Sequence, residues 1–430
     1  MKNMIRHIYQ DLLNWKNSST RKPLILQGAR QVGKTWLMKE FGKREFEQVA
    51  YLNFESSQRL KTLFLVDFDI SRIISIIEIE IGYKIQAEKC LIIFDEIQEA
   101  DKGLTVLKYF YEQAPHYHII AAGSLLGVSL QKGTSFPVGK VDFLRMYPMS
   151  FFEFLENNDQ QLLLEQLQKS NWEILNSFHD KLISLLRLYF FIGGMPEAVA
   201  NYHQYQDLNQ VRDIQEKILL GYENDFAKHA PFDIVPRIRL VWSHLISQLA
   251  KDNRKFIYGQ LKKGARAKDF EMAITWLTEA GLILKVVMVE KPALPLKAYA
   301  DIDIFKLFCL DVGLLNAMAE NSPRILLEKN SILTEFKGAL TEQFVAQQLT
   351  IKHDIFYWSA PSATAEVDFL LQKDSQMIPI EVKAEENLKS KSLKVFTEKF
   401  HPQQAIRFSM SPYRERDWMA NVPLYAVNGF

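Results

Sequence analysis

The sequence predicts an α/β protein whose first part is a parallel β-sheet with helices on both faces. Apolar runs of four to six residues recur at Leu24–Gln27, Cys90–Phe94 and Tyr117–Ala122, separated by stretches of helical pattern. A glycine or an acidic residue follows each run. Buried parallel strands deliver functional side chains to the carboxyl edge of a sheet in this way.

Length and composition narrow the class of protein. A chain of 430 residues favours two to four domains, and 48% hydrophobic with 24% charged residues is ordinary for a globular protein. The net charge of +1 does not by itself indicate any class of partner, so a surface that binds nucleic acid would have to be a local patch. Cys90 and Cys309 lie in apolar runs, which indicates buried thiols and a cytoplasmic location. We expect no signal peptide, and no membrane span because no apolar run reaches about 18 residues.

A glycine-rich loop follows the first strand and leads into a helix. Its residues are Gly28, Ala29, Arg30, Gln31, Val32, Gly33, Lys34, Thr35 and Trp36. The glycines let backbone N–H groups surround phosphates, Lys34 can reach the β- and γ-phosphates, and the Thr35 hydroxyl can ligate Mg²⁺. The helix from about Thr35 directs its positive end toward the anion. The loop therefore predicts ATP and Mg²⁺ as ligands.

Two acids follow the second strand. We expect Asp95 to hold the magnesium and Glu96 to act as the base that activates the attacking water, with Lys34 as the other catalytic residue. Ser124, after the third strand, is either a sensor of the γ-phosphate or part of a Gly-Ser turn. Further strands are expected at 49–55 and 143–147.

The order of these motifs resembles the bacterial and archaeal AAA-type P-loop ATPases. The resemblance extends through the Pro-Met-Ser-Phe-Phe-Glu-Phe run at 148–154 and Gly-Gly-Met-Pro-Glu at 193–197. Within that group, the chain is similar to a family that joins the ATPase to an uncharacterised, restriction-endonuclease-like domain. Family members commonly carry arginine where this chain has Lys140, so Arg145 is either the alternative arginine finger or a surface arginine on a strand. The resemblance leaves open a homo-oligomer.

The middle of the chain divides into two predicted modules. Residues 156–232 have a helical pattern and would form a lid or linker. Residues 233–322 read as helix, helix, strand and returning strand, the outline of a winged helix. The stretch 251–268 holds seven basic residues, namely Lys251, Arg254, Lys255, Lys262, Lys263, Arg266 and Lys268. This stretch is either a DNA-contacting face, a protein-contacting face or an ordinary solvated surface.

The last part of the chain carries a second set of candidate residues. Asp368 lies on one predicted strand, Glu381 and Lys383 share a face of the next, and Glu342 lies on a preceding helix. Glu342, Asp368 and Glu381 would bind Mg²⁺, while Asp368, Glu381 and Lys383 would act on a phosphodiester. The pattern is similar to the restriction-endonuclease motif. There are two alternatives. One is a surface hairpin whose Glu381–Lys383 contact has no catalytic role, and the other is a nuclease-derived fold that binds nucleic acid or a partner protein without cutting.

The predicted domains are an ATPase (1–155), a helical lid (156–232), a winged-helix-like module (233–322) and a nuclease-like α/β domain (323–430). One functional hypothesis is an ATPase coupled to a nucleic-acid-binding or cleaving domain. The other is an ATP-driven switch whose C-terminal half binds a partner and cuts nothing.

Overall fold

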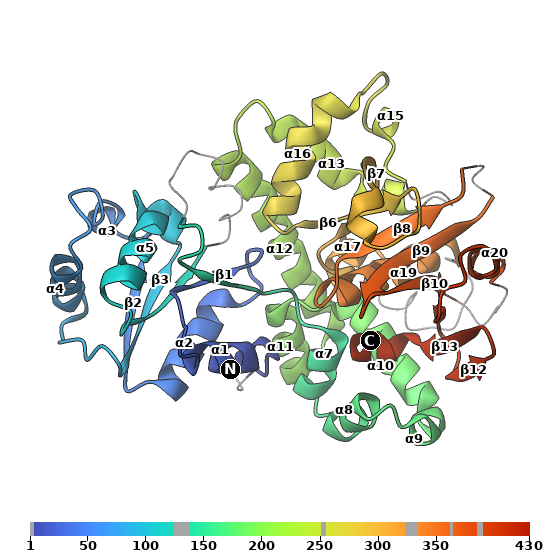
Figure 1. Cartoon of the computed structure of the whole chain (residues 1–430), viewed down its shortest axis with the longest axis horizontal. Helices are drawn as coiled ribbons and strands as arrows, with labels where there is room; N and C mark the ends of the chain where they lie inside the picture. The colour runs from blue at the N-terminus through green and yellow to red at the C-terminus, as the bar shows by residue number, and fades with distance from the viewer. Residues whose placement is uncertain (1–3, 124–136, 251–254, 323–333, 362–363, 385–389) are drawn as a thin grey trace. The chain divides into compact units, whose positions relative to one another are not determined.

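The computed structural model describes residues 4–123, 137–250, 255–322, 334–361, 364–384 and 390–430 (Figure 1). The chain divides into two compact units. The first unit comprises residues 6–147 and 279–281, and the second unit comprises residues 1–5, 148–278 and 282–430. No helix within the described ranges is both long and apolar enough to cross a bilayer.

The first unit is built on a five-stranded parallel sheet, in the order β2-β3-β4-β1-β5. Its strands are β1 (Leu24–Gln27), β2 (Gln48–Asn53), β3 (Cys90–Asp95), β4 (His118–Ala122) and β5 (Asp142–Arg145). Its helices are α1 (Ile8–Lys16), α2 (Lys34–Glu45), α3 (Gln58–Lys61), α4 (Ile70–Ile81), the short 3₁₀ helix η1 (Ile97–Glu99) and α5 (Gly103–Gln113). The phosphate-loop strand β1 therefore lies inside the sheet, between β4 and the edge strand β5.

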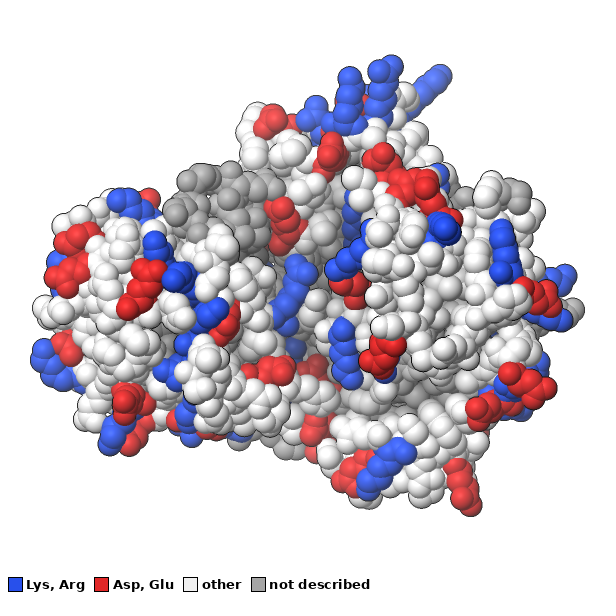
Figure 2. All heavy atoms as spheres, viewed as in Figure 1, with Lys and Arg blue, Asp and Glu red and all other residues white. Residues whose placement is uncertain are grey.

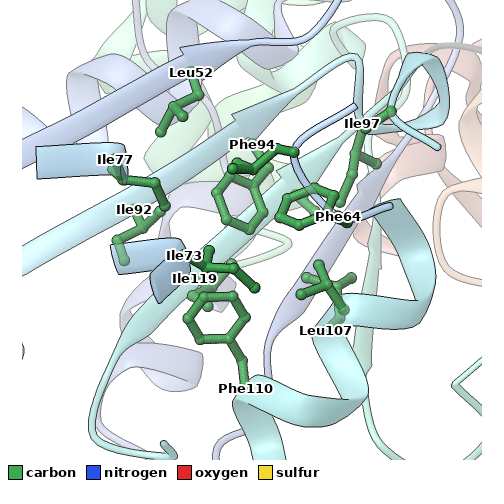
Figure 3. Packing of buried hydrophobic residues seen from close by; sticks show 14 of the residues in the cluster. Leu52, Phe64, Ile73, Ile77, Ile92, Phe94, Ile97, Leu107, Phe110 and Ile119 are labelled. Carbon is green, nitrogen blue, oxygen red and sulfur yellow. The ribbon is translucent and has the colours of Figure 1, made fainter. Parts of the chain in front are cut away.

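Helices cover both faces of this sheet because the side chains of each strand alternate. Leu91 of β3 lies against α2, where a Cβ on Gly42 would come within 3.3 Å of its side chain. Ile92 and Phe94, at alternate positions, belong to the core formed with α4 and α5 (Figure 3). Phe94 is fully buried, and burying such a side chain is worth about 1.5–3 kcal/mol. The predicted fold class is confirmed.

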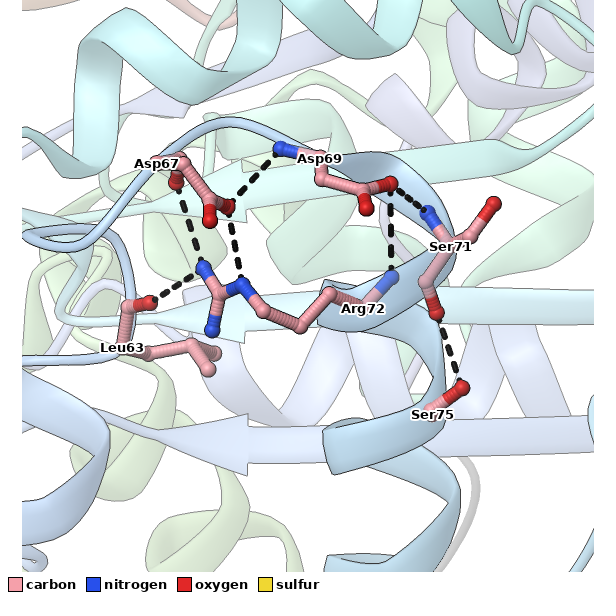
Figure 4. A network of polar contacts seen from close by, with 6 residues as sticks. All are labelled: Leu63, Asp67, Asp69, Ser71, Arg72 and Ser75. Atoms are coloured by element: carbon pink, nitrogen blue, oxygen red, sulfur yellow. Dashed lines mark hydrogen bonds and ion pairs between the residues drawn. The ribbon is translucent and has the colours of Figure 1, made fainter.

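Helix α4 owes its start to a local polar network. The Asp69 carboxylate accepts hydrogen bonds from the backbone N–H groups of Ser71 (2.9 Å) and Arg72 (3.5 Å), which caps the helix. Arg72 then folds back, and its Nε donates to Asp67 Oδ1 at 2.8 Å (Figure 4). The cap fixes where the isoleucine-rich face of α4 meets the sheet.

The second unit begins with a run of helices. They are α7 (Phe151–Asn157), α8 (Gln161–Gln168), α9 (Trp172–Ser177), α10 (His179–Ile192), α11 (Pro196–Tyr205), α12 (Leu208–His229), α13 (Val235–Ser243), α14 (Leu245–Leu249), α15 (Tyr258–Leu261) and α16 (Ala267–Glu279). Ser150 and Glu153 form a reciprocal capping box at the start of α7. Gly193, with φ +73°, ends α10, and Pro196 opens α11.

The same unit holds a mixed eight-stranded sheet, in the order β12-β13-β11-β10-β9-β8-β6-β7. Its strands are β6 (Ile283–Val289), β7 (Ala300–Cys309), β8 (Ile355–Ser359), β9 (Glu366–Lys373), β10 (Gln376–Lys383), β11 (Ile406–Ser409), β12 (Arg414–Arg416) and β13 (Met419–Pro423). The remaining elements are η3 (Leu296–Tyr299), α17 (Val312–Met318), α19 (Thr334–Thr350), α20 (Lys391–Phe400) and η4 (Leu424–Gly429).

The eight-stranded sheet includes strands from two modules that were predicted as separate domains, the winged helix (233–322) and the nuclease-like domain (323–430). Strands β6 and β7 are the returning strands of the predicted winged helix, and they pair antiparallel. Strand β6 also pairs with β8, so both continue the sheet of the predicted nuclease-like domain. The four-domain division stays a prediction.

A buried carboxylate ties the helices of this unit together. Asp311 is fully buried and accepts hydrogen bonds from the backbone N–H groups of Gly194 (2.6 Å) and Leu314 (3.0 Å) and from Gln347 Nε2 (3.1 Å). Burial raises the pKa of Asp311, although the backbone donors oppose that shift. Nearby, Gly194 O accepts from Met149 N at 2.6 Å.

This network leaves no room for a side chain at Gly194. A Cβ there would lie 2.1 Å from the backbone oxygen of Met149. We predict that Gly194→Ala destabilises the second unit by about 3 kcal/mol, because backbone must move to relieve the overlap. Gly259→Ala is the matched control, since a Cβ at Gly259 meets nothing within 4 Å. Thermal unfolding followed by circular dichroism measures both, and equal melting temperatures for the two variants would contradict the prediction.

Candidate functional site

The glycine loop of the first unit has the backbone that its sequence predicts. Gly28 has φ +149°, Gln31 +65° and Gly33 +95°, so the chain turns through conformations that favour glycine. A Cβ on Gly28 would lie 2.3 Å from Met146 O. Helix α2 begins at Lys34, immediately after the loop, and thus presents its N-terminus to the space that the loop encloses.

Lys34 lies inside the loop. Its side chain is 7% exposed, and Nζ donates to Gly28 O and Ala29 O, both at 2.7 Å. Burial lowers the pKa of Lys34 to about 8, while Glu96 and Asp95 act in the opposite direction. The lysine that would meet phosphate is therefore held by loop carbonyls and is poised to exchange them for an anion.

The other loop residues differ in exposure. Val32 is buried, Gln31 is exposed, and Arg30, Thr35 and Trp36 are half-buried. Arg6, itself 5% exposed, fixes the loop from outside: Nη1 donates to Val32 O at 2.8 Å and Nη2 donates to Tyr147 O at 2.7 Å. Arg6 thereby connects the phosphate loop to the chain just beyond β5.

Asp95 collects two hydroxyl groups at the end of β3. Thr35 Oγ1 and Tyr51 Oη each donate to Asp95 Oδ2 at 2.8 Å. Burial, with the neighbouring Asp95, raises the pKa of Tyr51 to about 12, so the phenol stays protonated as a donor. The hard oxygen donors of Thr35 and Asp95, next to the loop, fit a magnesium ion.

Glu96 follows in a left-handed conformation, with φ +52°. Such a backbone is unfavourable for a residue with a side chain, and strain of this kind concentrates at functional sites. Gln98 Nε2 donates to Glu96 Oε2 at 2.5 Å, so a neighbour orients the carboxylate. Asp95 and Glu96 are successive residues at the end of β3, but different side chains contact them: Thr35 and Tyr51 donate to Asp95, and Gln98 donates to Glu96.

Three further expectations concern this unit. Ser124 lies outside the described residues. Lys140 forms an ion pair with Glu112 at 3.0 Å. The Arg145 guanidinium lies 5.9 Å from the centre of the Tyr147 ring. Neither arrangement assigns an arginine finger.

In the second unit, the predicted acids lie on neighbouring elements but with protein partners. Asp368 Oδ2 accepts from the backbone N–H of Val382 at 2.7 Å. Lys383 Nζ contacts Glu381 Oε1 at 2.8 Å, whereas Glu381 Oε2 is buried with no hydrogen-bond partner among the described residues. The hairpin β9–β10 thus brings Asp368, Glu381 and Lys383 to one part of the sheet.

Glu342 of α19 is engaged by a lysine that the sequence reading missed. Lys306 of β7 is fully buried, and its Nζ lies 2.5 Å from Glu366 Oε1 and 3.9 Å from Glu342 Oε2. Within the described ranges, no group of three or more His, Cys, Asp or Glu side chains is arranged to hold a metal ion. That Glu342, Asp368 and Glu381 bind Mg²⁺ stays a prediction.

The basic stretch is described from residue 255 onward. Lys262, Lys263, Arg266 and Lys268 are exposed, and Lys255 is half-buried. Figure 2 shows Lys and Arg side chains gathered over the α15–α16 segment. Lys251 and Arg254 lie outside the described residues. The exposed cluster is compatible with each of the three alternatives that the sequence leaves open.

Sequence reasoning missed Tyr51, Arg6 and Lys306. Tyr51 lies on a strand that was expected, next to β3, so its hydroxyl was a findable signal. Lys306 interrupts the apolar run Ile304–Cys309, and a lone charge in such a run signals a buried partner. Arg6 carries no local signal, because its partners are 26 and 141 residues away.

The chain is similar to several solved structures at low sequence identity. The Walker-type ATPase PABY2304 of Pyrococcus abyssi is 14% identical, with a TM-score of 0.47, over 74% of this chain and 96% of that one. The ORC1 protein of Aeropyrum pernix, solved with DNA, gives 11% and 0.29, over 74% and 91%. The branch migration motor RuvB of Thermotoga maritima gives 13% and 0.30, over 67% and 90%. These values are too low to bear on function.

Comparison with protein families assigns three segments. Residues 183–324 and 337–426 match two domains of unknown function, DUF8612 and DUF4143. No curated protein matches the chain. Residues 20–155 match the family described as "AAA domain". With its loop geometry and parallel sheet, this segment is similar to P-loop domains of the AAA type.

Proposed function

We propose that the first unit binds ATP and hydrolyses it with the help of Mg²⁺. The observation that carries the proposal is the junction of the loop with the acidic strand, where Thr35 and Tyr51 both donate to Asp95. Lys34 lies in the loop itself and Glu96 directly follows Asp95. A phosphate-binding cradle, a magnesium-binding pair and a base are the parts that ATP hydrolysis requires.

Each residue has a distinct role in this proposal. Magnesium, when bound through Thr35 and Asp95, neutralises charge on the phosphate oxygens. Lys34 exchanges the two loop carbonyls for the β- and γ-phosphates. Glu96 orients the attacking water and accepts its proton, and the hydrogen bond from Gln98 keeps the carboxylate aimed. Ser124 is the proposed γ-phosphate sensor.

The lowered pKa of Lys34 predicts a pH dependence of nucleotide binding. Above pH 8 the lysine of the free protein is neutral, so binding must take up a proton. We expect the Kd for ATP to rise with pH above about 8, approaching tenfold per pH unit. Calorimetry in two buffers of different ionisation enthalpy measures the uptake. Lys34→Met should bind weakly without uptake, and a pH-independent wild-type Kd would contradict the role.

Glu96→Gln should separate binding from turnover. The amide cannot accept a proton, so we expect hydrolysis to fall by about 10²-fold or more while ATP affinity stays near the wild-type value. Glu99→Gln is the matched control, because Glu99 is ion-paired with Lys61 at 3.6 Å outside the proposed site. Phosphate release and nucleotide titration measure the two quantities. Wild-type turnover by Glu96→Gln would exclude Glu96 as the base.

For the second unit, we propose a switch role: nucleotide state controls how it engages a partner or DNA, without cutting a phosphodiester. Lysines or backbone donors already engage its carboxylates, which supports this choice over metal-dependent cleavage. The exposed basic residues of 262–268 offer a contact for phosphate groups. Cleavage is retained as the second candidate, because Asp368, Glu381 and Lys383 lie on one hairpin.

A plasmid assay distinguishes the two candidates. Wild type and Asp368→Ala are incubated with supercoiled and linear DNA, Mg²⁺ or Mn²⁺, and ATP. We expect both proteins to leave the DNA intact, because Lys306 and Lys383 lie against Glu342 and Glu381. Cleavage by wild type that is lost in Asp368→Ala would establish the nuclease candidate instead.

A further inference from the structure

Lys306 is a fully buried lysine at the centre of a polar site. Burying an ammonium group is unfavourable unless anionic partners compensate it. Lys306 has two such partners, Glu366 on β9 and Glu342 on α19, at 2.5 and 3.9 Å. Its ammonium also lies 4.7 Å from the centre of the Tyr357 ring of β8.

The elements around Lys306 come from widely separated parts of the second unit. Strand β7 carries the lysine, β8 and β9 lie two and three places away in the sheet, and α19 packs on β7, β8 and β10. Burial, with the nearby Glu366, raises the pKa of Tyr357, which therefore stays protonated. Lys306 is thus the cation at the point where the helix acid meets the sheet.

We propose that Lys306 is an internal cation that takes the place of a divalent metal ion at Glu342 and Glu366. Magnesium demands near-octahedral oxygen ligands at about 2.0–2.1 Å. The lysine Nζ lies 2.5 Å from Glu366 Oε1 and 3.9 Å from Glu342 Oε2, so a metal bound to these oxygens would lie close to a positive charge. This inference extends the proposal that the second unit acts without metal-dependent cleavage.

The neighbouring acids follow the same pattern. Lys383 occupies one oxygen of Glu381, and the N–H of Val382 occupies one of Asp368. Glu381 and Asp368 thus each have one oxygen engaged by the protein itself. Removing Lys306 alone should take away the positive charge between Glu342 and Glu366 and so make the two carboxylates a better site for a divalent cation.

The test is Mn²⁺ binding, followed by electron paramagnetic resonance without nucleotide. All proteins carry Asp95→Asn, which removes the carboxylate of the P-loop site and makes the readout independent of ATP hydrolysis. We expect Lys306→Met to gain a saturable Mn²⁺ site, at least about tenfold tighter than any in the parent. Lys306→Met with Glu342→Gln should lose that gain. Lys297→Met, which removes an exposed lysine paired with Asp354, should behave as the parent.

A thermal-shift measurement keeps the inference falsifiable if Lys306→Met is unstable. We expect its melting temperature to fall and 1 mM Mn²⁺ to restore about 5 °C or more, with little effect on the parent. Either of two results overturns the inference. One is a parent protein that binds Mn²⁺ through Glu342, shown by loss of the signal in Glu342→Gln. The other is a Lys306→Met protein that neither binds nor is stabilised by Mn²⁺.

Discussion

The second unit depends on the buried carboxylate of Asp311. A fully buried anion is tolerated only when hydrogen bonds compensate it, and Asp311 receives them from Gly194, Leu314 and Gln347. Because these donors belong to the α10–α11 turn, α17 and α19, satisfying one side chain fixes three segments. The helical part and the sheet part of the unit are joined at this point.

The same network explains two motifs whose chemistry was obscure in the sequence. Met149 N donates to Gly194 O, and Met149 O accepts from Tyr189 Oη at 2.5 Å. Gln348 Oε1 accepts from Phe151 N at 2.9 Å. The Pro-Met-Ser-Phe-Phe-Glu-Phe and Gly-Gly-Met-Pro-Glu stretches therefore shape a junction through backbone contacts. Their residue types reflect steric limits and capping rather than a reaction.

Features that depend on residues close together in the sequence could be predicted, whereas contacts between distant segments could not. The phosphate loop, its strand and its helix are neighbours in the chain, so the local sequence is enough to predict how they are arranged. Asp95 and Glu96 follow a buried strand, and that local pattern suffices. Lys306 could not be placed, because its partners depend on how β7 and α19 meet. The pairing of β6 with β8 likewise escapes a periodicity argument, since alternation shows which faces are apolar but not which strand lies alongside.

The contact of Arg6 with Val32 and Tyr147 also has a consequence for synthesis on the ribosome. Strand β1 pairs with β4 and β5, which are both synthesised later. The hydrogen bond from Arg6 can form only after Tyr147, 141 residues further along the chain, has been synthesised. At about 5–20 residues per second, that interval lasts about 7–28 s. The hydrogen bond from Arg6 to Tyr147 therefore forms late in the synthesis of the first unit. Arg6 joins the phosphate loop to the end of the sheet only after the last strand, β5, has been made.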